Sequence, residues 1–342
     1  MEYILALTHV DDTGYALTRA SLEVVAAALA LANQLEAPLT VGIIGANAAS
    51  AANVLASSGA RLLVVSGEPF AQARYATDAA ACEALCRTAR STIVLAPASA
   101  RLARVAAGVA HRLNGFIDTH IGSIAAGDTI QVTRWFYRQR IEAVLTRDTR
   151  PWFLLLDAGT HVAFSGHSGP AQVEEVVVSL PALRTTVAGL REPRQDQQTI
   201  RPDAKLLLVA GAGWTKKQPD GQIHATEAGS LILGFLHATG ASLGSSKSLV
   251  DQGGDGSSVL PFLTHLNQIG QTGATPRHAK GLSTCCHGEE PHVVGWRFIA
   301  DRRAISLDPN CGWTRGKADV VYVADAFHVI AKLNLLLEAK KL

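Results

Sequence analysis

The stretch YILALTHVDDTGYALTRASLEVVAAALALANQLEAPLTVGII, residues 3–44, decides the fold class. It opens with a short apolar run at 3–7, continues through an alanine-rich segment of helical period at 16–37, and ends in a second β-rich run at 39–44. A strand, a helix and a strand in this order form a βαβ unit, in which the two strands run parallel. The stretch therefore predicts an α/β domain built on a parallel sheet.

The same alternation continues along the first half of the chain. We expect further strands at 61–67 and 91–97, and further helices at 47–60 and 78–90. From 117 to 147 the pattern changes to alternating strands with glycine turns, and the apolar runs PWFLLLDAG (151–159) and VEEVVVSLP (173–181) follow. This change predicts a doubly wound sheet that is closed by a mixed or antiparallel edge.

A second domain is expected after residues 191–203, REPRQDQQTIRPD, which lack an apolar period and have the composition of a linker. The βα alternation restarts there. Its segments are KLLLVAGAG (205–213), a helix at 225–240, a strand or loop at 242–254, then 265–273, 302–309, 319–326 and a final helix at 327–341. The sequence thus predicts an N-terminal α/β domain over 1–190 and a second doubly wound, Rossmann-like parallel-sheet domain over 204–342.

The composition excludes several classes of protein. Hydrophobic residues make up 48% of the 342 residues and charged residues 18%, which is typical of packed globular proteins. The formal net charge is +2, so the chain lacks the basic field that holds nucleic acid or acidic membranes. The first apolar run is too short for a signal peptide and the run at 22–35 too short for a membrane span. We therefore expect a cytoplasmic protein without nucleic-acid or membrane partners.

The cysteines indicate reduced thiols rather than a disulfide framework, because they are odd in number and scattered. They are Cys82, Cys86, Cys285, Cys286 and Cys311. Cys82 and Cys86 lie one helical turn apart, and we expect them to pack in a core rather than to bind a metal.

Two features of the first domain suggest contacts with a partner. The aromatic triplet Trp-Phe-Tyr at 135–137 is interleaved with arginines, a composition enriched at interfaces, although packing in the core is the alternative. His9, Asp11 and Asp12 follow the first strand, where they are expected to cap the next helix or to contact a partner.

Candidate binding residues fall at the ends of the expected strands of the second domain. Gly211 and Gly213 directly follow a buried strand, so the backbone could turn tightly and present N–H groups to a phosphate. Polar residues follow at Ser246, Lys247, Gln271, Thr272, Ser283, Ser306 and Asp325. Because ligands of open α/β sheets bind outside the carboxyl ends of the strands, we expect these residues to converge on one crevice.

The order of these motifs resembles the C-terminal, FAD-binding domain of the electron transfer flavoprotein alpha subunit. GAG (211–213) stands where that family has G-R-G, SSKSLVDQG (245–253) where it has A-S-R-A-x-V-D-x-G, and QIGQTG (268–273) matches outright. LSTCCHG (282–288) stands for I-S-G-A-x-Q-H, AISLDP (304–309) for A-I-N-K-D-P, and ADVVYVAD (318–325) for A-D-Y-x-x-V-x-D. The first half is similar through IVLAPASARLARVAAGVAHRL (93–113), so the resemblance covers nearly the whole chain.

The resemblance implies that the second domain holds one FAD. Gln271 and Thr272 would lie beside the isoalloxazine ring, with Thr272 near N5, and Ser246 and Lys247 would meet the same edge. Residues 283–287 would wrap the pyrophosphate and the pyrimidine edge, and Ser306, Asp325 and Ala326 would border the adenosine half. The implied cofactor-binding residues are Gly211, Ala212, Gly213, Ser246, Lys247, Ile269, Gly270, Gln271, Thr272, Ser283, Thr284, Cys285, Cys286, His287, Gly288, Ser306, Asp325 and Ala326.

The chain also departs from the family pattern. Ala212 replaces the arginine of G-R-G, which removes a cationic partner of the cofactor, and Ser306 replaces an asparagine. Trp214 and Lys216 lie close enough in sequence to take the place of that arginine. Gly288 aligns with the family's histidine without a gap, and a one-residue shift would align His287 instead.

The resemblance implies the alpha subunit of a heterodimeric electron transfer flavoprotein, paired with a beta subunit. Such a protein carries electrons from a flavin-dependent dehydrogenase, of the acyl-CoA or the N-methyl amine or amino-acid type, to a quinone oxidoreductase, and acts on no substrate of its own. One alternative is an FAD-free scaffold subunit of a dehydrogenase complex. Another, a nicotinamide-dependent dehydrogenase, is disfavoured because GAG lacks the third glycine and the usual acidic residue roughly 20 positions on.

Overall fold

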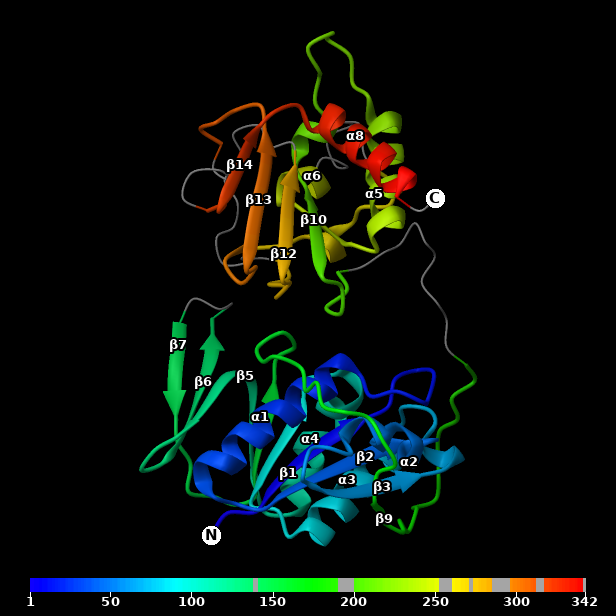
Figure 1. Ribbon diagram of the computed structural model, residues 1–342, viewed down its shortest axis with the longest axis vertical. Helices are drawn as coiled ribbons and strands as arrows, with labels where there is room; N and C mark the ends of the chain where they lie inside the picture. Colours follow the sequence, from blue (N-terminus) through cyan, green and yellow to red (C-terminus); the bar gives the residue numbers. More distant parts are fainter. Residues whose placement is uncertain are drawn as a thin grey trace. The chain divides into compact units, whose positions relative to one another are not determined.

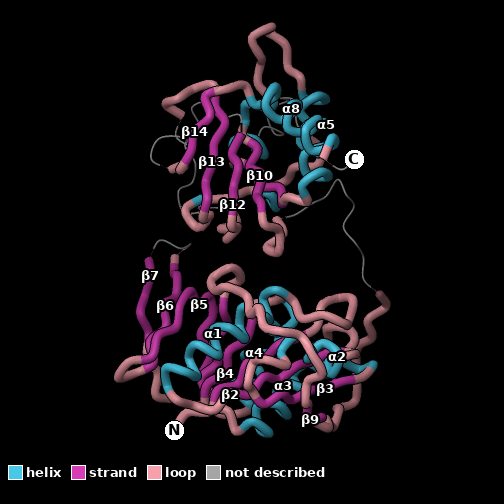
Figure 2. The backbone as a smooth tube through the Cα atoms, in the orientation of Figure 1, coloured by secondary structure: helices cyan, strands magenta, loops and turns pink. Residues whose placement is uncertain are grey.

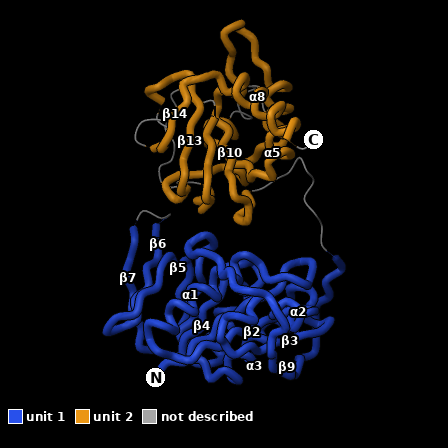
Figure 3. The backbone as a smooth tube through the Cα atoms, in the orientation of Figure 1, with its two compact units in different colours: residues 1–190 blue, residues 191–342 orange. Residues whose placement is uncertain are grey.

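The computed structural model describes residues 1–137, 141–189, 200–251, 260–270, 273–284, 296–311 and 317–340. The chain divides into two compact units, Met1–Leu190 and Arg191–Leu342 (Figure 3). Each unit has its own sheet and its own hydrophobic core.

The first unit is built on a mixed sheet. Within its described residues nine strands pair in the order β7-β6-β5-β8-β4-β1-β2-β3-β9 (Figure 1). Their bounds are β1 Ile4–His9, β2 Leu39–Gly45, β3 Arg61–Ser66, β4 Ile93–Pro97, β5 Phe116–Ala126, β6 Ile130–Phe136, β7 Ile141–Leu145, β8 Trp152–Leu156 and β9 Val173–Glu175. The pairs from β5 to β9 along this order are parallel, whereas β5–β6 and β6–β7 are antiparallel. The expected parallel α/β sheet with an antiparallel edge is confirmed.

Helices cover both faces of this sheet. The helices are α1 Arg19–Leu35, α2 Ala48–Ala51, α3 Tyr75–Ala89 and α4 Ala100–Arg112, with short 3-10 turns at Ala52–Leu55 and Glu68–Phe70. Alternate residues of β1 divide between two cores, so that α1 and α2 pack on one face and α3 and α4 on the other. The expected helix at 47–60 is shorter, because a 3-10 turn follows α2 directly.

The thiols of α3 face the core. Cys82 and Cys86 are buried side by side one helical turn apart, and burial raises the pKa of Cys82 well above its usual range and that of Cys86 to about 12. The nucleophilic thiolate is therefore disfavoured at both positions. Their expected role as packing residues agrees with this placement.

The chain after β8 crosses the face of α1 and returns to the opposite edge of the sheet. Phe164 N donates a hydrogen bond to Leu22 O of α1 at 3.0 Å, and β9 then pairs with β3. The expected strand at 173–181 is limited to β9. Beyond β9, Val176, Val178 and Leu180 pack against the core on the other face, whereas Val177 is exposed.

The second unit is built on an all-parallel sheet. Among its described residues five strands pair in the order β11-β10-β12-β13-β14. Their bounds are β10 Leu206–Ala210, β11 Ser242–Ser245, β12 Lys280–Thr284, β13 Asp301–Ser306 and β14 Val320–Val323. The helices α5 Ala225–Thr239 and α8 Ala326–Ala339 lie side by side and share one core (Figure 2), and a second core with Trp296 covers the other face. This is the second parallel-sheet fold that the sequence predicts.

Two segments of the second unit differ from what the sequence pattern predicts for them. In the described part of 265–273, His265–Asn267 form a 3-10 turn, η6, and Gln268 and Ile269 form isolated bridges to Ser245 and Ala274. Residue 201 lies inside the segment expected to link the domains. Its backbone nevertheless bonds within the second unit, where Arg201 N donates to Ser242 Oγ at 2.7 Å and Arg201 O lies 2.8 Å from His278 Nε2.

A buried carboxylate ties the antiparallel edge of the first unit to its parallel part. Asp118 of β5 is 1% exposed and accepts hydrogen bonds from Arg147 Nη2 at 3.0 Å and from Trp152 Nε1 at 2.9 Å, while Arg134 Nη1 of β6 lies 3.5 Å away. Burial raises the pKa of Asp118. The hydrogen bonds from Arg147 and Trp152 and the charges of Arg147 and Arg134 outweigh burial, so the net pKa lies below its usual value.

We expect Asp118→Asn to lower the free energy of unfolding by about 3 kcal/mol at neutral pH, since it leaves two arginines beside a neutral group. Because the folded-state pKa is depressed, the carboxylate stabilises the fold above about pH 4. This contribution is lost as the pH falls through the folded-state pKa, so the difference between the two proteins should shrink in acid.

Urea unfolding of both proteins across this pH range measures the effect. Glu174→Gln, which breaks the exposed pair between Arg61 and Glu174, is the control and should change the stability far less than Asp118→Asn. A loss in Asp118→Asn no larger than that in the control would contradict the structural role of Asp118.

Candidate functional site

The carboxyl ends of four strands of the second unit lie level at one edge of the sheet. Ala210 pairs with Ser245 on one side and with Thr284 on the other, and Thr284 pairs with Ile305. Backbone hydrogen bonds continue this register past the strand ends, since Gly211 N donates to Thr284 O and Ser246 N to Ala210 O, both at 2.9 Å. The register therefore brings the described binding residues at the carboxyl ends of β10, β11, β12 and β13 to the same edge.

The strand order places a switch point at this edge. β10 leads through α5 to β11 on one side, whereas the later strands β12, β13 and β14 are added on its other side. Connections leave the neighbouring strands β10 and β12 in opposite directions, and ligands of doubly wound sheets bind at such points. The row from β11 to β14 spans four strand spacings, about 19 Å. An extended dinucleotide can lie along such a row.

The G-A-G turn after β10 is closed by its own side chains. Residues 211–215 are all buried, and Ala212–Thr215 form a 3-10 turn, η4. Trp214 Nε1 donates a hydrogen bond to Thr284 Oγ1 at 2.8 Å, and its ring lies 4.5 Å from that of Phe327 in α8. The idea that Trp214 replaces the family's arginine is therefore wrong, because the indole is committed to the core. Lys216 remains exposed beside the turn.

Two buried hydroxyls at this edge have no hydrogen-bond partner among the described residues. Ser283 Oγ of β12 and Ser245 Oγ of β11 lie in side chains that are 1% and 0% exposed. A buried hydroxyl without a partner costs free energy, and such a group marks a place where a bound molecule can supply the missing bond. Ser245 was not among the expected site residues; the serine doublet at 245–246 was the available signal.

The start of α6 (Lys247–Asp251) follows β11 directly. Ser246 Oγ accepts a hydrogen bond from Leu249 N at 3.2 Å, so its hydroxyl caps the helix while its proton stays available to a ligand. Lys247 is about half exposed, and its ammonium pairs with Asp251 one turn along the helix. The Lys247 ammonium is thus held near the carboxyl end of β11.

The backbone before the Q-T-G motif turns sharply. Ile269 N donates to Ser245 O at 3.1 Å, and Gly270 has a φ of +119°, in the region that favours glycine. A Cβ on Gly273 would lie 2.2 Å from Gln268 O, so a glycine is required there as well. The expected site residues Gln271, Thr272, Cys285, Cys286, His287 and Gly288 lie outside the described residues.

The expected adenosine-side residues lie at the ends of β13 and β14. Ser306 is 1% exposed, and its hydroxyl accepts a hydrogen bond from Asp308 N at 3.2 Å. Asp325 Oδ1 accepts one from Phe327 N at 2.8 Å and caps α8, which begins at Ala326. Both polar side chains are therefore fixed in position by the backbone next to them.

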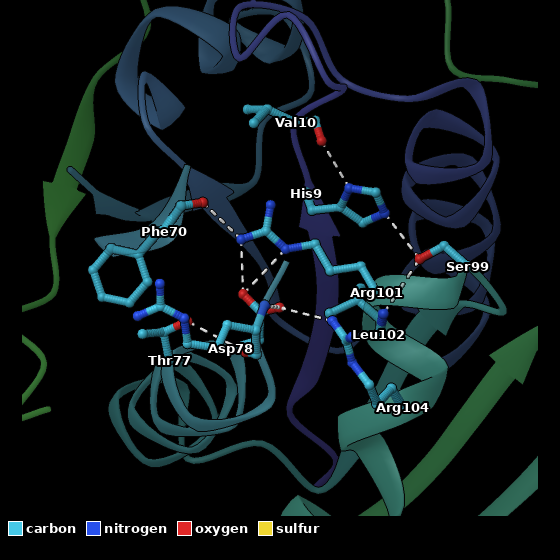
Figure 4. A network of polar contacts seen from close by, with 10 residues as sticks. His9, Val10, Phe70, Thr77, Asp78, Ser99, Arg101, Leu102 and Arg104 are labelled. Carbon is cyan, nitrogen blue, oxygen red and sulfur yellow. Dashed lines mark hydrogen bonds and ion pairs between the residues drawn. The ribbon is translucent and has the colours of Figure 1, made fainter. Parts of the chain in front are cut away.

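The carboxyl edge of the first unit carries a second polar network (Figure 4). Arg101 of α4 and Asp78 of α3 are both buried, and Arg101 Nη2 donates at 2.7 Å to Asp78 Oδ1 and to Phe70 O. His9 Nδ1 lies 2.8 Å from Val10 O, and burial lowers the pKa of this imidazole. The Arg101–Asp78 pair joins two helices, which is a structural role.

The polar residues directly after β1 do not cap α1. Asp11 accepts hydrogen bonds from Thr13 Oγ1 at 2.6 Å and from Gly14 N at 3.2 Å within its own turn. Thr18 caps α1 by accepting from Ser21 N at 3.1 Å. The expectation that His9, Asp11 and Asp12 cap this helix is therefore wrong, because the capping residue is Thr18, which directly precedes the helix.

Among the helices of the described residues, none combines the length and the apolar character that a membrane crossing needs. In the same part of the chain, no group of three or more His, Cys, Asp or Glu side chains is placed to hold a metal ion. The candidate site is therefore defined by hydroxyls, backbone turns and the Lys247 cation.

The neighbouring residues Ser283 and Thr284 provide a matched test of the site. Ser283→Ala should change the free energy of unfolding of the ligand-free protein by less than about 0.5 kcal/mol, or raise it, because the described residues offer the removed hydroxyl no partner. Thr284→Val should cost about 1–3 kcal/mol, because it leaves the buried Trp214 N–H without its acceptor. Denaturant unfolding measures both. Equal losses in the two variants would show that the Ser283 hydroxyl is structural.

The sequence of the first unit matches a known protein family. Residues 6–182 match the family model described as the electron transfer flavoprotein domain. The match spans just over half of the 342 residues and nearly the whole of the first unit. No curated protein matches the chain. On this evidence, the chain belongs to the electron transfer flavoprotein domain family.

Proposed function

We propose that this protein is the FAD-carrying alpha subunit of a heterodimeric electron transfer flavoprotein. Electrons would arrive from a flavin-dependent dehydrogenase and leave to a quinone oxidoreductase. The family match supports a role in flavin-associated electron transfer. The motifs of the second unit support the finer assignment, because G-A-G, S-S-K and Q-I-G-Q-T-G resemble those of the alpha subunit's cofactor domain.

The observation that carries the proposal is the unpaired hydroxyl of Ser283 at the switch point of a parallel sheet. Ser283 belongs to β12, which adjoins β10 and its G-A-G turn. A phosphate or carbonyl oxygen of a bound dinucleotide would accept the hydrogen bond that the described residues leave unmade. The site thus fits FAD in its polar groups as well as in the length of its row of strand ends.

Each group at the edge has a physical task toward the cofactor. FAD, when bound, would supply one- and two-electron transfer. The hydroxyl of Ser246 could donate to it without releasing the cap of α6, and Lys247 would set a positive charge near its reactive edge. Asp325, held by Phe327 N, would place a carboxylate where a ribose hydroxyl could donate to it.

The antiparallel edge of the first unit supports a partner subunit. Tyr137, Ile141 and Val144 are 75%, 52% and 61% exposed on β7 and at the end of β6. Large apolar side chains at this exposure favour a protein contact. A beta subunit is the partner proposed for them. An acyl-CoA dehydrogenase and an N-methyl amine or amino-acid dehydrogenase are equally compatible electron donors.

One observation favours the alternative of an FAD-free scaffold subunit. Ala212 is fully buried and Trp214 fills the space beside Thr284, so the G-A-G turn offers no cation to the cofactor. A subunit that lost FAD could keep the fold and assemble a dehydrogenase complex. The Ser283 and Ser245 hydroxyls, which have no partner among the described residues, argue for a retained ligand.

The purified complex decides between the two functions. When the full chain is produced with its beta subunit, the complex should be yellow, and acid extraction followed by chromatography should release FAD. Ser283→Ala should lower the ratio of flavin to protein, because one hydrogen bond to the cofactor is lost. Recovery of FMN would overturn the cofactor assignment, and a colourless, correctly assembled complex would support the scaffold.

A further inference from the structure

Asp251 lies where its carboxylate meets a lysine and a histidine of different elements. One carboxylate oxygen pairs with the Lys247 ammonium at the start of α6. The other oxygen lies 3.7 Å from Nδ1 of His265 in η6, the turn that leads into the Q-I-G-Q-T-G motif. Asp251 therefore connects the lysine after β11 to the segment that carries the second motif of the candidate site.

This contact is not needed for the stability of the fold. The side chains of Lys247, Asp251 and His265 are 48%, 39% and 69% exposed. Pairs at such exposure contribute little to the free energy of unfolding, because water screens the charges and the long side chains lose freedom. The pair instead acts locally. It sets the position of the Lys247 ammonium and compensates its charge.

We propose that Asp251 is a positioning residue that holds the Lys247 ammonium and offsets its charge at the cofactor edge of the second unit. This inference rests on the proposed function, in which FAD lies beside Lys247. A reduced flavin carries more negative charge than an oxidised one, so a nearby ammonium favours reduction. Asp251 opposes this effect by keeping the ammonium in an ion pair.

The flavin potential of the assembled complex measures this effect. Asp251→Asn keeps the shape of the side chain and removes its charge. We expect the equilibrium constant for addition of the first electron to rise about tenfold, which corresponds to about 59 mV. Lys247→Met should change the same constant in the opposite direction, and Lys247→Arg should nearly preserve it.

The double variant separates positioning from a direct charge effect. If Asp251 acts through Lys247, Asp251→Asn should change the potential in the Lys247→Met background by less than a third of its effect in the wild type. An equal effect in both backgrounds would mean that Asp251 acts on the flavin directly, and would overturn the positioning role.

Asp319→Asn is the matched control. Asp319 also pairs with an exposed cation, Arg302 Nη2 at 2.9 Å, but it precedes β14 at the amino end of the same sheet. Its substitution should leave the potential unchanged. An unchanged potential in Asp251→Asn, with flavin bound to the wild type, would overturn this inference alone. A wild-type complex without flavin would overturn the proposed function, and this inference with it.

Discussion

The parallel register of β10 with both of its neighbours is the constraint on which the candidate site depends. Ala210 is held between Ser245 and Thr284, and the hydrogen bonds of Gly211 N and Ser246 N carry this alignment one residue beyond the strands. Because parallel strands end at the same edge, segments far apart in sequence deliver their polar groups to one row. The motifs need not be neighbours in the sequence; they need only follow strands of matched length.

The buried polar side chains of the two units differ in whether they have a partner at the positions discussed above. In the first unit, Asp118 and Asp78 are buried with arginine partners, and each links the element that carries it to neighbouring elements. At the carboxyl edge of the second unit, the hydroxyls of Ser245 and Ser283 are buried without a partner among the described residues. Paired charges specify how elements pack, whereas an unmade hydrogen bond is a cost that a ligand can remove. The two hydroxyls at the switch point of the second sheet are the physical reason for proposing a cofactor in the second unit.

The sequence predicted the elements whose residues carry a clear period. The βαβ start, the four inner strands of the first sheet and the helices at 225–240 and 327–341 all follow from apolar patterns that match their burial. The prediction failed where small residues interrupt the apolar pattern. β12 has the sequence Lys-Gly-Leu-Ser-Thr and had no expected range of its own, yet it lies at the centre of the second sheet. Trp214 was also misjudged, since only the fold shows that Thr284 is within reach of its indole. The contact between Asp251 and His265 joins separate elements and could not be predicted from spacing.

Hydrogen exchange of the complex with and without its flavin tests the central claim most directly. If FAD lies along the carboxyl edge of the second sheet, its presence should slow exchange in peptides that cover 211–216 and 246–251, through new contacts and exclusion of water. Peptides at the amino end of the sheet, around Lys280 and Asp301, should exchange at the same rate in both forms. Protection at the amino end, or protection confined to the first unit, would contradict this account of where the cofactor binds.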